Sequence, residues 1–375
     1  METFDQFKKI FQNRHAYAKE WKAKTGKNVF GYMCTYVPEE VIHAAGILPI
    51  RILGSHEPQD VTEPHIYTMF CPFSRDVLAQ GLQGRYNYLE GVVYAHSCLH
   101  MRQAYASWTK HVPMKYSRYI FVPSKVQSPR ADPMLTKEIA DFRKSLEEFT
   151  GKKITDKDLQ NSIDVYNTNR RLMRQIYEMR KGDQPLISGT EAAYMVLSSM
   201  VSDKAEHNKL LEKAIKELPT RKDLPKPGTR LMIISSILDS IEFLELVEKL
   251  DAIIVTDDVC DGTRYFWNEV QPEKDLIHAI ALRYINRPPC PAKDWEKRSR
   301  YPFIQNLARE YKVQGAIVVQ QKFCDPHEFD IPPIMNMLKE MGIPSIFLEF
   351  DITVPVGQFH TRVEAFLEML QLDLV

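Results

Sequence analysis

The sequence predicts an α/β protein made of two Rossmann-like parallel-sheet domains with an additional helical segment. Short apolar runs alternate with helical segments at both ends of the 375-residue chain, a pattern typical of parallel sheets. The middle of the chain instead shows the 3.6-residue periodicity of packed helices. At roughly 150 residues per domain, the length indicates two to three domains. We therefore expect an N-terminal α/β domain over 1–133, a helical segment and linker over 134–227, and a C-terminal α/β domain over 228–375.

Local signals place the elements of the first domain. Pro38 and the two glutamates after it indicate a helix start, because proline suits the first turn and carboxylates suit the positive helix end. A charged amphipathic N-terminal helix is expected to end near Gly26. That N-terminal helix is expected over 3–25. Further helices are expected over 71–81 and 99–110. The expected strands cover 29–33, 48–53, 91–95 and 119–123.

The remaining two thirds of the chain divide at a proline-rich stretch. About four helices are expected over 134–218, and the three prolines between Pro219 and Gly228 are typical of a linker. After it the alternation returns. Expected strands cover 230–235, 252–256, 315–320 and 344–349. Expected helices cover 239–250, 272–285, 301–312, 331–341 and 358–371.

Charge and composition argue against several classes of protein. Lys plus Arg and Asp plus Glu both number 49, so no basic excess points to a nucleic-acid partner. No apolar run approaches the ~18 residues of a membrane span, and the charged N-terminus is unlike a secretory signal. We therefore expect a cytoplasmic protein with no nucleic-acid or membrane partner. No dinucleotide fingerprint, P-loop, H-E-x-x-H, C-x-x-C or G-x-S-x-G motif occurs.

The six cysteines fall in loops or at the ends of predicted elements. Ligands of parallel sheets collect at the carboxyl ends of the strands. Four of the cysteines follow predicted strands, namely Cys34, Cys98, Cys260 and Cys324. Cys71 precedes a helix, where backbone N–H groups and the helix dipole favour a thiolate. Cys290 lies in a stiff proline-rich loop.

Two interpretations of these cysteines compete. A free cysteine is most often a small buried hydrophobe, which predicts positions inside apolar strands or helix stripes. None of the six lies in such a position, and thiols of a cytosolic protein are kept reduced. The joint pattern therefore favours a metal or cluster site. An all-thiolate set drawn from distant loops suits an iron–sulfur cluster better than a catalytic zinc.

Three side chains are candidates for acid–base catalysis. Asp258, with Asp257, follows a predicted strand, where a carboxylate transfers protons or merely caps a helix. His327 and Glu328 come three and four residues after Cys324. They are candidate proton donors beside a cluster, and an exposed loop pair is the alternative.

Eight stretches share their order and context with one known family. They are residues 31–40, 44–46, 70–72, 97–98, 257–265, 289–290, 322–327 and 357–362. Through them the chain resembles the 2-hydroxyacyl-CoA dehydratase and benzoyl-CoA reductase family over nearly its whole length. Within that family it most resembles a small catalytic subunit of ATP-dependent benzoyl-CoA reductase.

The resemblance implies a [4Fe–4S] cluster at the interface of the two domains. Its thiolate ligands would be Cys71, Cys98 and Cys324. A related branch of the family carries a double-cubane [8Fe–9S] cluster held by six cysteines. The further ligands in that case would be Cys34, Cys260 and Cys290, and both forms stay open at this point.

The resemblance also implies partners and a reaction. The partners would be a homologous cluster-bearing subunit and a separate ATP-hydrolysing activator that delivers single low-potential electrons. The expected function is the iron–sulfur subunit of an aromatic acyl-CoA (benzoyl-CoA) reductase in anaerobic aromatic degradation, with an aromatic acyl-CoA as substrate. The alternatives are an (R)-2-hydroxyacyl-CoA dehydratase subunit, a double-cubane reductase of small molecules, and a non-enzymatic electron-transfer subunit.

Overall fold

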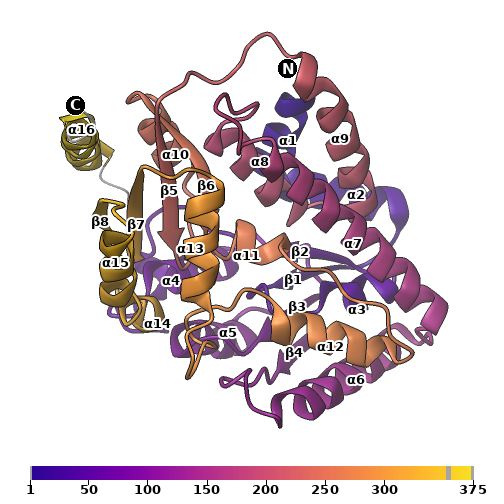
Figure 1. The fold of residues 1–375 in the computed structure, drawn as a ribbon. Helices are drawn as coiled ribbons and strands as arrows, with labels where there is room; N and C mark the ends of the chain where they lie inside the picture. Colours follow the sequence, from indigo (N-terminus) through magenta and orange to yellow (C-terminus); the bar gives the residue numbers. More distant parts are fainter. Residues whose placement is uncertain (1, 352–355, 373–375) are drawn as a thin grey trace.

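The protein contains two four-stranded sheets in which every strand pairing is parallel (Figure 1). The structure is a computed structural model that describes residues 2–351 and 356–372. The first sheet has the order β2-β1-β3-β4, with β1 (Val29–Tyr32), β2 (Leu48–Arg51), β3 (Gly91–Ala95) and β4 (Tyr116–Ile120). The second has the order β6-β5-β7-β8, with β5 (Thr229–Ser235), β6 (Ala252–Asp258), β7 (Gly315–Gln321) and β8 (Ser345–Phe350).

The two sheets repeat one topology, because each places its second strand at one edge and its fourth at the other. The predicted α/β class is thereby confirmed, and the shared strand order is a likeness between the halves that the sequence does not display. We call the part of the molecule around the first sheet the first lobe and the part around the second sheet the second lobe.

Helices surround both sheets. Their bounds in the described residues are α1 (Glu2–Gln12), α2 (Arg14–Thr25), α3 (Glu39–Ala44), α4 (Pro72–Leu82), α5 (Leu99–His111), α6 (Ala131–Thr150), α7 (Asp156–Glu178), α8 (Gly189–Ser199), α9 (Lys204–Glu217), α10 (Ile241–Glu248), α11 (Thr263–Phe266), α12 (Leu276–Asn286), α13 (Arg300–Glu310), α14 (Asp325–Glu328), α15 (Ile331–Glu340) and α16 (Val356–Leu372). No helix in these ranges is both long enough and apolar enough to cross a membrane.

The four helices expected in the middle of the chain are α6 to α9, and their starts have clear local causes. Thr155 before α7 and Ser188 before α8 each form a capping box with the acidic residue three positions later. The Asp203 carboxylate accepts hydrogen bonds from two N–H groups at the start of α9. These caps satisfy backbone donors that a helix start otherwise leaves unpaired.

Three predicted elements differ most from the structure. The helix expected over 3–25 is interrupted at Asn13, because its two parts pack differently: Phe7 of α1 belongs to the core of the second lobe and Ala18 of α2 to that of the first. α12 begins at Leu276 instead of 272, since Asp275 caps its first turn. β4 begins at Tyr116, which pairs with Gly91, so it lies three residues before the predicted strand.

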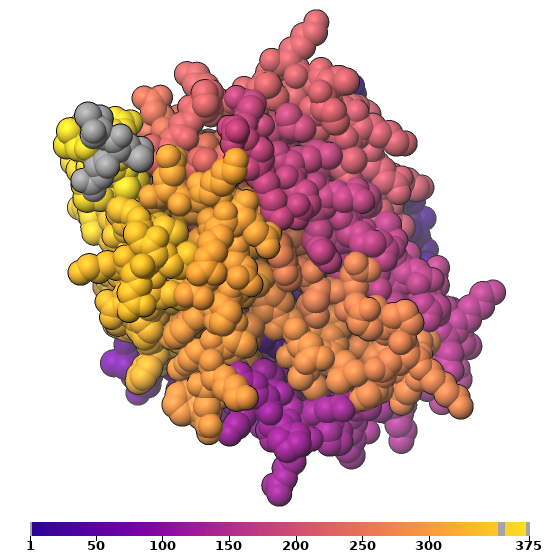
Figure 2. All heavy atoms as spheres, viewed as in Figure 1, coloured from indigo at the N-terminus to yellow at the C-terminus, as the bar shows by residue number. Residues whose placement is uncertain are grey.

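Each lobe has its own hydrophobic core, but the chain crosses between them. α12 lies late in the sequence, yet its Ile280 packs in the first core, and α12 lies against α6 (Figure 1). α1 lies at the other end of the chain and packs against α8. The space-filling view shows the two halves of the chain in contact over this face (Figure 2). Helices from one part of the sequence thus pack in the core of the other lobe. The predicted domain boundaries stay a prediction.

An ion pair also joins the lobes. His56, in the loop after β2, places Nε2 3.0 Å from Oδ1 of Asp239, which precedes α10. The Asp239 carboxylate also accepts a hydrogen bond from the Gly54 N–H at 2.5 Å. Burial opposes a charge on His56, but the Asp239 carboxylate outweighs it and raises the pKa of His56 from 6.5 to about 9.

This pair makes stability depend on pH. The pKa of His56 is higher in the folded state, so its contribution is complete below about pH 6.5 and is lost as the pH rises through about 9. We expect His56→Asn to lower the free energy of unfolding more at pH 6 than at pH 10. Asparagine suits the left-handed backbone of this position, where φ is 58°. Urea unfolding at both pH values measures the difference, and equal losses would contradict the assignment.

Candidate functional site

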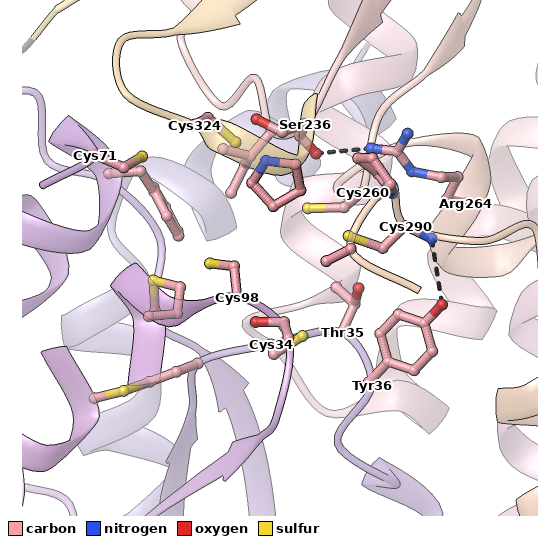
Figure 3. A pocket seen from close by; sticks show the side chains of 18 of the residues that line it. Cys34, Thr35, Tyr36, Cys71, Cys98, Ser236, Cys260, Arg264, Cys290 and Cys324 are labelled. Atoms are coloured by element: carbon pink, nitrogen blue, oxygen red, sulfur yellow. Dashed lines mark hydrogen bonds between the residues drawn. The ribbon is translucent and has the colours of Figure 1, made fainter. Parts of the chain in front are cut away.

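All six cysteines of the chain line one cavity between the lobes (Figure 3). The cavity encloses about 680 Å³, part of which is open to solvent. Every cysteine is free of disulfide bonds, and in Figure 3 their side chains surround the same space. Residues that are far apart in the sequence therefore meet at one site, where the strands of both sheets end.

Three of these thiols form a first set, Cys71, Cys98 and Cys324. They are the residues that precede α4, α5 and α14, respectively, so each stands at the start of a helix. The backbone N–H groups of Ser74, Met101 and His327 partly oppose the rise that burial causes in the pKa of the three thiols. Such donors, with the dipoles of α4 and α5, favour negative charge at this end of the cavity.

The thiols of the first set are mutual neighbours. Burial is the main cause that raises the pKa of each to about 12, and the charge of a neighbouring thiolate adds to the rise. Cys98 raises the pKa of Cys71, Cys324 that of Cys98, and Cys71 that of Cys324. Cys290, outside this set, adds a smaller rise to the pKa of Cys98 and of Cys324. Cys71 is buried and Cys98 and Cys324 are half-buried, and thiols with a raised pKa stay protonated until a metal displaces the protons.

The other three thiols form a second set, Cys34, Cys260 and Cys290. Burial is the main cause that raises the pKa of Cys260 and of Cys290. The Cys290 thiolate adds to the rise at Cys260, and Cys34 adds to the rise at Cys290. The loop of Cys290 is held by its own N–H, which donates to the Tyr36 hydroxyl at 3.3 Å (Figure 3).

The side chains of the cavity lining that could bind a metal are all thiols. Among residues 2–351 and 356–372, no three His, Cys, Asp or Glu side chains are close enough to hold one metal ion. The thiols instead surround a space, which a cluster with several irons requires. The cavity lining holds six thiols and neither a carboxylate nor an imidazole. An all-sulfur set of this kind is typical of iron–sulfur ligation.

Three guanidinium groups also line the cavity, those of Arg51, Arg264 and Arg287. In two of them both terminal nitrogens bind protein acceptors, and only Nε has no hydrogen-bond partner among the described residues. Arg264 contacts the Asp258 carboxylate at 3.1 Å and donates to two backbone carbonyls, and Arg287 donates to the carbonyls of Thr35 and Arg264. Arg51 and Arg287 were not predicted as site residues from the sequence. Arg51 ends β2, so the strand-end argument used for the cysteines could have found it.

The predicted acid–base residues lie outside the cavity lining. Asp258 ends β6 instead of following a strand, and it is buried between Arg264, at 3.1 Å, and Arg300, at 2.7 Å. His327 is buried too, with Nε2 3.1 Å from the Val319 carbonyl and Nδ1 3.3 Å from Arg300. Burial, helped by Arg300, lowers the pKa of His327 well below 6.5. Glu328 is exposed. A catalytic role for the three stays a prediction.

Residues 34–370 match the family described as 2-hydroxyglutaryl-CoA dehydratase, D-component, and the chain belongs to this family. The resemblance seen in the sequence is thereby confirmed. The chain is 27% identical over 368 residues to the (R)-phenyllactyl-CoA dehydratase beta subunit of Clostridium sporogenes, with 98% of both chains covered.

Two further relatives show the range of the family. One of the benzoyl-CoA reductase subunits of Thauera aromatica is 26% identical, with 89% of this chain and 88% of the relative covered. The beta subunit of (R)-2-hydroxyglutaryl-CoA dehydratase of Acidaminococcus fermentans is 25% identical, with 98% of both chains covered. All three relatives are subunits of acyl-CoA dehydratases or reductases, and their identities to this chain are nearly equal.

Proposed function

We propose that this chain is the cluster-binding subunit of a low-potential reductase of its family, and that a double-cubane [8Fe–9S] cluster occupies the cavity. The observation that carries the proposal is that six thiols in two sets of three line one cavity. A single [4Fe–4S] cluster takes four ligands, so it would leave thiols of this cavity unused. Two sets of three match two joined cubanes.

The residues of the chain have separate tasks in this proposal. When bound, such a cluster supplies electrons one at a time at low potential. The two cysteine sets hold it, and the N–H groups at the starts of α4 and α5 stabilise its negative charge. Met33, Phe73, Met101 and Ile237 line the cavity with apolar surface. Those side chains limit the access of water, which a strongly reducing centre would otherwise reduce.

Iron counting tests the proposal directly. Anaerobically purified protein is expected to be brown and to contain about eight irons per chain, whereas a single cubane would give about four. Electron paramagnetic resonance of the reduced protein shows whether the iron belongs to a cluster. A colourless, iron-free protein from anaerobic purification would overturn the proposal.

A second candidate follows from the difference between the sets. Only the cysteines of the first set all stand at helix starts, which favours a single [4Fe–4S] cluster on Cys71, Cys98 and Cys324. In that form the chain would be a subunit of an aromatic acyl-CoA (benzoyl-CoA) reductase or of an (R)-2-hydroxyacyl-CoA dehydratase. It would act with a homologous cluster-bearing subunit and a separate ATP-hydrolysing activator. The names of the relatives, which are subunits of larger enzymes, support a partner of the first kind.

Substrate assays distinguish the two enzymes to which the chain could belong under this second candidate. The reductase would consume benzoyl-CoA with continuous ATP hydrolysis, whereas the dehydratase would dehydrate a 2-hydroxyacyl-CoA with only catalytic ATP. Both assays need the partner subunit and the activator, so they follow the iron count.

A further inference from the structure

Arg51 is a buried cation with unused hydrogen-bond donors at the edge of the cavity. It is the last residue of β2, it lines the cavity, and it is 3% exposed. In the described part of the chain, Nε and Nη1 have no hydrogen-bond partner. No carboxylate there lies within ion-pair distance of its guanidinium, whereas Arg264 is paired with Asp258. Arg51 therefore leaves a terminal nitrogen without a partner, whereas Arg264 and Arg287 leave only Nε without one.

Such an arrangement is costly unless a partner arrives. A guanidinium stays protonated at every physiological pH, so burial cannot neutralise it. A buried charge without a partner destabilises a protein, and natural proteins pair such charges or use them on ligands. The cavity is the place from which a partner for Arg51 would come.

Neighbouring rings hold the guanidinium in place. Its central carbon lies 5.7 Å from the centroid of the Tyr32 ring and 5.8 Å from that of the Phe73 ring. The Arg51 N–H donates to the Met200 carbonyl at 2.8 Å, which anchors the backbone at the end of β2. Aromatic contacts orient a planar cation without using its N–H donors, so the donors remain for an anion.

The position of Arg51 relates it to both cysteine sets. Phe73, whose ring it contacts, is two residues beyond Cys71 of the first set. Cys260 of the second set lines the same cavity as Arg51. The guanidinium of Arg51 therefore borders the space that a group bound by both cysteine sets would occupy.

We propose that Arg51 is the cationic hydrogen-bond donor to the cluster and raises its reduction potential. The inference rests on the proposed function, because it needs a cluster in the cavity. Each one-electron reduction adds one negative charge to a cluster, and a fixed positive charge beside it favours the reduced state. Loss of the guanidinium is therefore expected to make the cluster harder to reduce.

An anaerobic redox titration tests this role. Full-length protein is titrated with titanium(III) citrate, which gives one electron per Ti(III) oxidised to Ti(IV), and the reduced cluster is followed by electron paramagnetic resonance. The variants are Arg51→Met, Arg51→Lys and, as a matched control, Arg180→Met. Arg180 is also buried, at 1% exposure, but it does not line this cavity.

The expected order of midpoint potentials is definite. Arg51→Met shifts the potential to a more negative value at unchanged iron content, Arg51→Lys shifts it less, and Arg180→Met leaves it at the wild-type value. If Arg51→Met does not accumulate as folded protein, Arg51→Gln replaces it, since it keeps amide donors without the charge. An unshifted potential in the neutral variant would overturn the role of Arg51. Iron-free wild-type protein would instead overturn the proposed function.

Discussion

Replacing Cys260 by alanine is expected to reduce the iron content of the anaerobically purified protein as strongly as replacing Cys98 by alanine. The two residues belong to different sets, and both line the same cavity. In a double cubane each set holds one half of the cluster, so either variant is expected to fall from about eight irons to about four or fewer. Iron analysis and electron paramagnetic resonance of the two variants, side by side, provide the measurement.

The control for this pair of variants is Met101→Leu. Met101 also lines the cavity and carries sulfur, but it offers no thiolate. Iron content close to that of the wild-type protein is expected for it. A Cys260→Ala variant that retains wild-type iron, next to an iron-free Cys98→Ala variant, would show that only the first set binds metal and would support the second candidate.

Replacing Asp258 by alanine is expected to lower the free energy of unfolding by about 3–5 kcal/mol, the usual effect of removing one partner from a buried ion pair. The Asp258 carboxylate lies between the guanidinium groups of Arg264 and Arg300, and all three side chains are almost fully buried. Arg300 keeps a second carboxylate, Asp330, at 3.1 Å. Arg264 loses the only carboxylate that pairs with it in the described ranges.

Urea unfolding of iron-free, reduced protein measures the effect of Asp258→Ala apart from any contribution of a bound cluster. Asp183→Ala is the matched control, since Asp183 pairs with Lys312 at 2.5 Å on the surface, where water and salt screen the pair. Little change is expected for it. A small effect of Asp258→Ala would mean that the buried cations find other partners, and would free Asp258 for the acid–base role predicted from the sequence.

Much of the architecture could be predicted because parallel strands leave strong local signals. The apolar runs that form β1, β3 and β7 were found, and the cysteines that follow them lie around one cavity. The break at Asn13 could not be predicted, because it depends on which core each part of the helix packs against. The transfer of α12 to the first core is a tertiary effect of the same kind.

The site was predicted less completely, because the distance between two residues along the chain does not show where their side chains point. His327 follows Cys324 closely, but the short helix α14 turns its ring into the protein, toward the Val319 carbonyl and Arg300. Arg51 lies twenty residues before Cys71 in sequence and still faces the cavity, since β2 ends at the same edge as β1. Only the assembled sheet shows which side chains share a space.

The distribution of the thiols between the lobes bears on how the protein is made. The first lobe contributes Cys71 and Cys98 to the first set, and the second lobe adds Cys324. In the second set, Cys34 follows β1 and Cys290 follows α12, both in the first lobe, and Cys260 follows β6 of the second lobe. A nascent chain therefore completes neither set before Cys290 has left the ribosome, and completes both only after Cys324. In the proposed holoprotein, cluster insertion would be a late step of biosynthesis that fastens two already folded lobes to each other.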